Sequence, residues 1–322
     1  MKNKRFVMPR RNVVTICDKM LNYFTTQCSI VNLRSGSISL TSSKLVQRRR
    51  FFPTVPGVQH VPYPDCYRCP YKHERDSCGT HCAKMIEEVY FQSIVPPEEV
   101  AAVFLEPVLG EGGYVVPPAQ FVKELARICK AYGILLVDDE VQAGMGRTGR
   151  MWAIEHYDVV PDIICSAKAL GSGVPIGATI FPRHMDFEPG AHSNTFGGNL
   201  LACASALATL DVLRSDGLVE NSALMGAYLR KRLLELQDGH QIIGDVRGLG
   251  LMQAIDLVKS LKTKEHAVKE RDKVIELCYK RGLILLPAGR SAIRLIPPLI
   301  VDEGMIDEAI EILGSALRDM AR

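Results

Sequence analysis

The clearest pattern in the chain is an alternation of short apolar runs with longer amphipathic segments. The apolar runs have the length of strands and cover residues 101–105, 134–138, 162–166 and 176–181. Apolar positions recur at helical spacing over residues 119–132 and 200–214. Strand, helix and strand in this order predict an α/β fold in which a mainly parallel sheet is flanked by helices.

A second group of elements follows Asp216 and Gly217, which interrupt the pattern. We expect helices over residues 218–236, 265–281 and 302–320, and strands within 245–256, 283–286 and 293–296. This mixture predicts a smaller α+β domain. The chain is therefore divided into an N-terminal segment (1–35), a large domain (36–214) and a small domain (215–322).

The first hundred residues carry weaker signals. Residues 1–35 match no clear element, and residues 37–71 are rich in proline and aromatic side chains, which predicts an extended loop. Residues 81–92 are helical in pattern. The regular part of the fold is therefore expected to begin near residue 100.

Polar side chains follow three of the predicted strands. Glu106 follows the first, the group Asp138, Asp139 and Glu140 with Gln142 ends the second, and Lys168 follows the third. Because parallel strands end at the same edge of a sheet, these side chains are expected to line one cleft.

Two further stretches suggest ligand contacts. Arg294 lies within the apolar strand IRLIPP, where it forms either a buried ion pair or a carboxylate clamp. The loop HSNTFGGN (192–199) precedes a helix, so it is either a phosphate site or an ordinary helix cap.

Composition excludes several classes of protein. The chain has 322 residues, of which 47% are hydrophobic and 23% charged, and its formal net charge is +3. This charge is too small to indicate a nucleic-acid partner, and no apolar run has the length of a membrane span. Ten cysteines in a chain of this size fit a reduced cytoplasm better than a disulfide scaffold.

One group of cysteines has spacings similar to those of a structural zinc site. The alternative is a proline-rich loop with small buried thiols. We expect no metal, and the weak candidates for ligands are Cys66, Cys69, Cys78 and Cys82.

A lysine, a carboxylate and an arginine in one cleft suit pyridoxal phosphate (PLP). The lysine can form a Schiff base, the carboxylate can keep the pyridine nitrogen protonated, and the arginine can bind a substrate carboxylate.

With these residues in place, the sequence resembles the class III aminotransferases, the ornithine and 4-aminobutyrate group of PLP fold type I. Six motifs carry the resemblance over about residues 37–322: FLEPVLGEGG, LLVDDEVQAGMGRTGR, PDIICSAKALGSGVPIGA, NTFGGNLLACASAL, VRGLGLM and IRLIPPL. The resemblance implies an aspartate aminotransferase-like fold. It also implies that the N-terminus is truncated, because the glycine-serine-rich phosphate loop and an aromatic-His-Gly motif of the family have no match in residues 1–35.

The resemblance also implies roles for individual residues. Lys168 resembles the lysine that forms the Schiff base and moves the substrate proton, and Asp139 the carboxylate paired with the pyridine nitrogen. Val141 would pack on the ring and Gln142 would reach its phenolic oxygen.

Thr195 is similar to a threonine that binds the cofactor phosphate across a homodimer interface. Arg294 resembles the clamp for the α-carboxylate, and Glu106 the glutamate that pairs with that arginine when an ω-amino substrate is bound.

The function implied is transfer of an amino group from an ω-amino or amino acid donor, 4-aminobutyrate- or ornithine-like, to a keto acid such as 2-oxoglutarate. Two alternatives remain open at this point. One is a PLP-dependent amino-acid racemase or epimerase of the same family, and the other is a catalytically inactive remnant that acts through partners.

Overall fold

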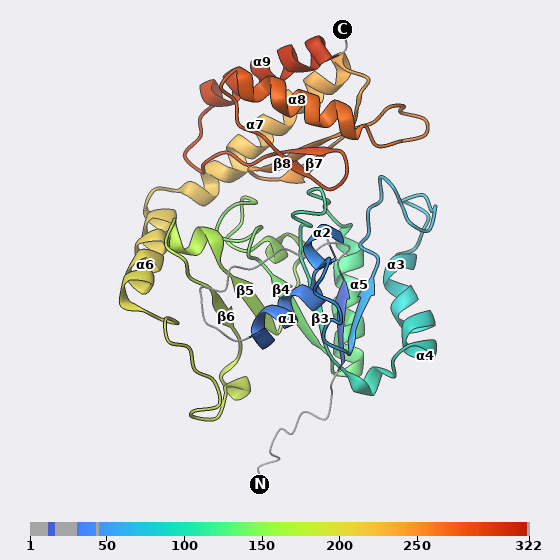
Figure 1. Ribbon diagram of the computed structural model, residues 1–322, viewed down its shortest axis with the longest axis vertical. Coiled ribbons are helices and arrows are strands. Elements are labelled where there is room, and N and C mark those ends of the chain that lie inside the picture. Colours follow the sequence, from blue (N-terminus) through green and yellow to red (C-terminus); the bar gives the residue numbers. More distant parts are fainter. Residues whose placement is uncertain (1–11, 17–30, 43–44, 321–322) are drawn as a thin grey trace.

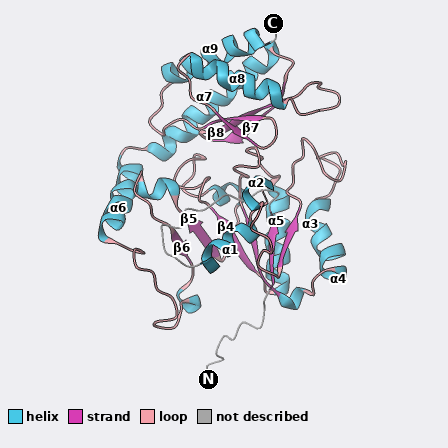
Figure 2. Ribbon diagram, viewed as in Figure 1, coloured by secondary structure: helices cyan, strands magenta, loops and turns pink. Residues whose placement is uncertain are grey.

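The computed structural model describes residues 12–16, 31–42 and 45–320. Within these residues the chain forms a six-stranded sheet of order β2-β1-β3-β4-β5-β6 and a four-stranded sheet of order β7-β8-β10-β9. Figures 1 and 2 show the first sheet in the lower part of the molecule and the second above it, beneath a layer of helices. The α/β class predicted from the pattern is confirmed.

The six-stranded sheet is parallel from β2 to β5, and β6 runs antiparallel to β5. Its strands are β1 (Asn12–Ile16), β2 (Val58–Val61), β3 (Val100–Leu105), β4 (Leu135–Asp139), β5 (Ile163–Ser166) and β6 (Ala178–Ile180). β1 belongs to the segment for which the sequence predicted no element. The remaining expectations for residues 1–30 lie outside the described residues.

Helices accompany this sheet. They are α1 (Val31–Leu40), α2 (Leu45–Arg48), α3 (His81–Met85), α4 (Phe91–Ser93), α5 (Ala119–Tyr132) and α6 (Leu200–Ser215), and a π-helical segment (Ile86–Tyr90) joins α3 to α4. The helix expected over 81–92 is therefore present. The extended loop expected over 37–71 is wrong in part, because this stretch contains the end of α1, all of α2 and β2.

Helix α5 has well-defined ends and packs on the six-stranded sheet through one apolar face. Pro118 precedes it, and Gly133 ends it in the left-handed conformation (φ 61°) that glycine adopts without strain. Its buried face is Phe121, Val122, Leu125, Ile128 and Cys129. Each large apolar side chain buried in this way contributes about 1.5–3 kcal/mol, so α5 fixes the sheet on which it packs.

The four-stranded sheet is antiparallel and is built from β7 (Ile243–Leu249), β8 (Met252–Leu257), β9 (Leu286–Ala288) and β10 (Ala292–Leu295). Helices α7 (Leu218–Gly239), α8 (Val268–Lys280) and α9 (Glu303–Met320) form a layer over this sheet (Figure 1). Helices α6 and α7 are separated by a turn in which Gly217 has φ 61°, and the domain boundary expected near residue 215 stays a prediction.

The two sheets meet through the turn at residues 110–113. The Gly289 N–H, at the end of β9, donates to the Glu111 carbonyl at 2.7 Å. The Arg247 Nε, on β7, donates to the Gly113 carbonyl at 2.8 Å. These bonds hold the turn after β3 against the second sheet.

In the described part of the chain, none of the helices combines the length and apolar character needed to cross a membrane.

Candidate active site at the ends of strands β3, β4 and β5

The register of the sheet brings the predicted polar residues to one edge. Leu105 pairs with Asp138, and Asp139 pairs with Cys165. Glu106 and Lys168 follow these positions by one and three residues respectively. The charges that act on Lys168 come from Glu106, Asp139, Glu111 and Arg294, so the structure gathers the expected lysine, carboxylates and arginine in one place.

Lys168 sits in a strained backbone conformation. Its φ of 45° lies in the left-handed region, which costs a residue with a Cβ about 1–2 kcal/mol. The lysine is exposed, yet the surrounding protein displaces part of its hydration water, and this desolvation lowers the pKa of its amine. The carboxylates of Glu106 and Asp139 oppose this shift. The result is an amine that gives up its proton more readily than an ordinary lysine.

Glu106 and Asp139 lie beside the lysine and are almost completely buried. The Gly110 N–H donates to Glu106 Oε2 at 2.8 Å, while Glu106 Oε1 has no hydrogen-bond partner among the described residues. Burial, followed by the nearby charge of Asp139, raises the pKa of Glu106 well above its usual range. Asp139 Oδ1 accepts from the Val141 N–H at 3.2 Å, which fixes this carboxylate at the end of β4.

A second carboxyl pair, Asp138 and Glu140, lies behind Asp139. The Ile154 N–H donates to Glu140 Oε1 at 2.8 Å. Burial raises the pKa of Glu140 to about 7, and burial together with the charge of Glu140 raises that of Asp138. Only one of the two is expected to be ionised at a pH below 7, because two buried carboxylates side by side repel each other.

Arg294 has a partner that the sequence analysis did not predict. Its Nη1 donates to Glu111 Oε1 at 2.5 Å, and both side chains are largely buried. Arg294 is thus paired with Glu111 here, and the pairing with Glu106 that is expected when an ω-amino substrate is bound stays a prediction. Glu106 accepts a hydrogen bond from the Gly110 N–H. Glu111 lies in the turn at 110–113 and contacts Arg294 on β10. The sequence analysis did not single out Glu111, although this residue is part of the motif FLEPVLGEGG. Its position between two glycines, Gly110 and Gly112, was the signal that could have identified it.

The residues at this edge fit PLP. Gln142 Oε1 and Ser166 Oγ are buried and have no hydrogen-bond partner among the described residues, so they offer polar atoms to a bound group. Val141 is buried next to Asp139, where an apolar side chain can pack on a ring. Gly110 leaves room for Gln142, because a Cβ at Gly110 would lie 2.8 Å from the Gln142 Cδ. An amine, a carboxylate and an amide are thus available at this edge of the sheet.

Thr195 lies in the segment 191–200, all of which is exposed. Its expected contact with the cofactor phosphate across a dimer interface stays a prediction. The neighbouring helix begins with an ordinary cap, since the Asn199 side chain accepts from the Ala202 N–H at 3.0 Å.

The four candidate metal ligands line one small cavity together with His73 and His81. No group of three or more His, Cys, Asp or Glu side chains in the described ranges is arranged to hold a metal ion. The Tyr67 and Arg68 N–H groups in the Cys66–Cys69 loop donate to Asp65 Oδ1 rather than to sulfur. The cluster is therefore described as a set of free thiols.

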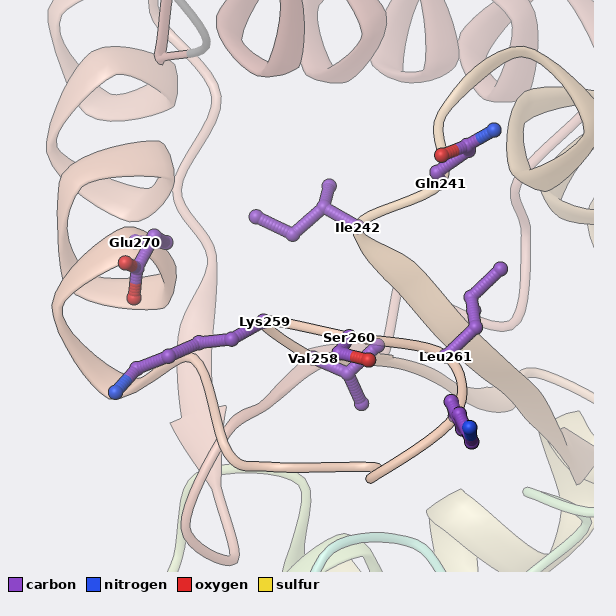
Figure 3. A pocket seen from close by; sticks show the side chains of 8 residues that line it. Gln241, Ile242, Val258, Lys259, Ser260, Leu261 and Glu270 are labelled. Atoms are coloured by element: carbon purple, nitrogen blue, oxygen red, sulfur yellow. The ribbon is translucent and has the colours of Figure 1, made fainter.

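A cavity of about 640 Å³ lies elsewhere, at the outer edge of the second sheet. Figure 3 shows Ile242 and Val258 from the sheet side and Glu270 on helix α8 around it. Lys259 on its rim pairs with Glu265. None of the predicted site residues lines this cavity, so the strand-end cleft remains the candidate active site.

Comparison with known proteins identifies the family. The sequence profile of the family "Aminotransferase class-III" matches residues 34–317. The chain is 42% identical over 265 residues to leucine/methionine racemase of Thermococcus litoralis, covering 82% of this chain and 60% of the relative. It is 34% identical over 311 residues to a probable 4-aminobutyrate aminotransferase of Bacillus subtilis, covering 93% of this chain and 71% of the relative.

Solved structures agree with this grouping. The amine transaminase from an uncultivated Pseudomonas species, in its PLP-bound form, aligns with a TM-score of 0.82 and 31% identity, covering 97% of this chain and 69% of that structure. The chain therefore spans about 60–70% of the length of the proteins it matches.

Proposed function

Because the chain belongs to the class III aminotransferase family, we propose that it binds PLP and transfers an amino group from an amino donor to a keto acid. When bound, PLP supplies an electron sink for the carbanion that forms at the substrate Cα. Lys168 Nζ and the carboxylate of Asp139 would hold the cofactor, with Gln142 and Val141 around its ring. The gathering of Lys168, Asp139, Glu111 and Arg294 at one edge carries this proposal.

Each residue has a task that follows from its surroundings. The lowered pKa of Lys168 lets Nζ accept a proton from the substrate Cα and return it to a neighbouring atom. Asp139, fixed at the end of β4, holds a proton on the pyridine nitrogen by its negative charge. Glu106 adds little negative charge beside Lys168, because burial favours the protonated form of its carboxyl group.

The pair formed by Arg294 and Glu111 supports a choice between two kinds of substrate. With Glu111 in place, the arginine is neutralised and the cleft accepts a substrate that has no carboxylate at that position, such as an ω-amino donor. When Glu111 moves aside, Arg294 can bind the carboxylate of a 2-oxoglutarate-like acceptor with two hydrogen bonds. We therefore propose a 4-aminobutyrate- or ornithine-like donor.

The substitution Glu111→Gln tests this choice. It should lower kcat/KM for 4-aminobutyrate about ten- to hundredfold, because a free Arg294 then faces the donor, and it should change kcat/KM for L-alanine much less. Glu106→Gln is the matched control, because it changes a carboxylate of the same cleft that does not contact Arg294. Equal losses for both donors in Glu111→Gln would remove the argument.

A racemase is the second candidate, favoured by the 42% identity to leucine/methionine racemase. Such an enzyme would return the proton to the opposite face of the substrate Cα without needing a keto acid. Incubation of L-leucine with the PLP-loaded protein distinguishes the two. Loss of optical rotation without added keto acid supports a racemase, and keto-acid-dependent product supports a transaminase.

We also propose that the chain acts as a homodimer in the cytoplasm. The apolar side chains exposed along α6 and the loop before it support a second copy on that face. A partner copy would bring its Thr195 loop to the cofactor phosphate. The cysteines within the described residues are free thiols, which suits a reducing compartment.

A further inference from the structure

A cavity of about 360 Å³ lies between the two halves of the molecule and is separate from the Lys168 cleft. The loop after β2, the turn after β3 and the β9–β10 hairpin enclose it. None of Lys168, Asp139, Glu111 and Arg294 lines it. Its charged and titratable lining residues are Tyr63, Asp65, Arg68, Arg247, Asp256, His266 and Arg290.

One buried aspartate in the wall pairs with two arginines, and one of these, Arg247, also pairs with Asp245. Asp256 Oδ2 accepts from Arg247 Nη1 at 2.9 Å and also from Arg68 Nη1. Ser291 Oγ donates to Asp256 Oδ1 at 2.6 Å. Burial would raise the pKa of Asp256, but the charges of Arg247 and Arg68 lower it. This carboxylate therefore stays ionised, and both of its oxygens accept hydrogen bonds.

Hydrogen-bond donors remain after these pairs are counted. Arg68 also donates from Nε to the Lys264 carbonyl at 2.9 Å, yet its Nη2 is buried and has no partner among the described residues. Arg290 is exposed at the tip of the β9–β10 hairpin, on the rim of the same cavity. Asp65 also lines the cavity, and its Oδ1 accepts from the N–H groups of Tyr67 and Arg68.

We propose that this cavity is a binding site for a small anion with a carboxylate or phosphate group. Arg68 Nη2 would donate from the buried end, and Arg290 would close on the ligand from the rim, with His266 beside it. Arg68 suits an oxyanion because Nε and Nη1 are held by the Lys264 carbonyl and Asp256, while Nη2 can form a charge-assisted hydrogen bond with the ligand. The site stands apart from the proposed amino transfer and does not depend on it.

The anion would join the two halves of the molecule. Arg68 belongs to the loop after β2, and Arg290 follows Gly289, whose N–H bonds the Glu111 carbonyl. Bound anion should therefore raise the melting temperature of the whole chain, because a ligand held by both halves stabilises their contact.

Isothermal titration with succinate and, separately, with inorganic phosphate tests the site and distinguishes the two ligand chemistries. We expect saturable binding of at least one anion, weakened about tenfold or more in Arg290→Gln because a charge-assisted contact is lost. Arg68→Lys is the second variant. It keeps a charge beside Asp256 but loses the planar donors, and it should weaken binding to a similar degree.

Two controls make the result decisive. Lys262→Gln removes an exposed cation from the loop between β8 and α8. Arg294→Gln removes the arginine near Lys168. Binding should persist in both. Unchanged affinity in Arg290→Gln, loss of binding in Arg294→Gln, or no saturable binding of either anion to the natural sequence would overturn the proposal.

Discussion

The two sides of the Lys168 cleft are built differently. On the side of β3 and β4, Asp139 is 3% exposed and Glu106 is 4% exposed. On the side of β6 and α6, Leu200 is 88% exposed and Leu201 is 72% exposed. One side buries charged groups and the other exposes apolar ones, which is the reverse of the usual distribution in both cases.

The difference distinguishes the groups that this chain positions alone from those that the proposed dimer would cover. The carboxylates on the buried side are positioned by bonds within this chain, such as Gly110 N–H to Glu106. The apolar residues on the other side remain largely exposed within this chain. The exposed set is Ile180, Phe187, Phe196, Leu200, Leu201 and Leu207. In the proposed dimer a second copy would cover this exposed side, and each side can be tested separately.

Asp139→Asn should have the largest effect on the buried side. Removing the negative charge at the end of β4 should reduce kcat about 10²- to 10³-fold, because a fixed charge at the reacting group is lost. Steady-state kinetics with PLP in excess would measure this. Near-ultraviolet circular dichroism should show that the fold is unchanged. An activity within about threefold of the natural sequence would contradict the role given to Asp139.

The buried carboxyl pair predicts an unusual dependence of stability on pH. Burial raises the pKa of Glu140 from 4.5 to about 7, so the folded chain keeps a proton that the unfolded chain releases in this window. The free energy of unfolding should therefore decrease as pH rises from about 4.5 to 7, by an amount on the order of 3 kcal/mol.

Glu140→Gln should flatten that decrease, because glutamine does not titrate. Urea unfolding at several pH values would measure the slope in each protein. Glu98→Gln, an exposed glutamate on the same half of the molecule, should keep the slope of the natural sequence. An unchanged slope in Glu140→Gln would assign the pH dependence to other groups.

The exposed side is tested by Leu201→Glu on α6. A charge on this face should weaken self-association about tenfold or more, since burial of one leucine contributes about 1.5–3 kcal/mol. Sedimentation velocity at several concentrations would show the shift toward the monomer. Leu224→Glu is the matched control, because Leu224 is 67% exposed on α7, outside that face. Equal weakening by both substitutions would mean that α6 is not the interface.

Gly110→Ala should have the smallest effect on stability. A Cβ there would lie 2.8 Å from the end of the Gln142 side chain, which can move, so the free energy of unfolding should change by about 1 kcal/mol or less. PLP affinity should fall because Gln142 is displaced. Gly239→Ala, which meets no atom within 4 Å, should leave PLP affinity unchanged. Unaltered affinity in Gly110→Ala would argue against a role for Gln142.

Much of this arrangement follows from the sequence because local patterns determine it. Apolar runs and helical spacing predicted β3, α5 and β4 to within about one residue, and the shared edge of parallel strands predicted that Glu106, Asp139 and Lys168 would meet.

The partner of Arg294 could not be predicted in the same way. Two glutamates stand five residues apart in one motif, and the choice of Glu111 depends on contacts with Gly289 and Arg247, which are distant in the sequence. The carboxyl pair of Asp138 and Glu140 was likewise hidden, since burial on both faces of β4 is a property of the packed sheet. Helices α1 and α2 were missed because their sequences have little helical periodicity.

Titration of the purified chain with PLP, followed by borohydride reduction and mass spectrometry, tests the central claim most directly. We expect one PLP-derived label per chain, attached to Lys168, and no specific label in Lys168→Ala, whose fold should remain intact. A label that persists unchanged in Lys168→Ala, or a natural sequence that takes up no PLP, would contradict the assignment of this cleft as the active site.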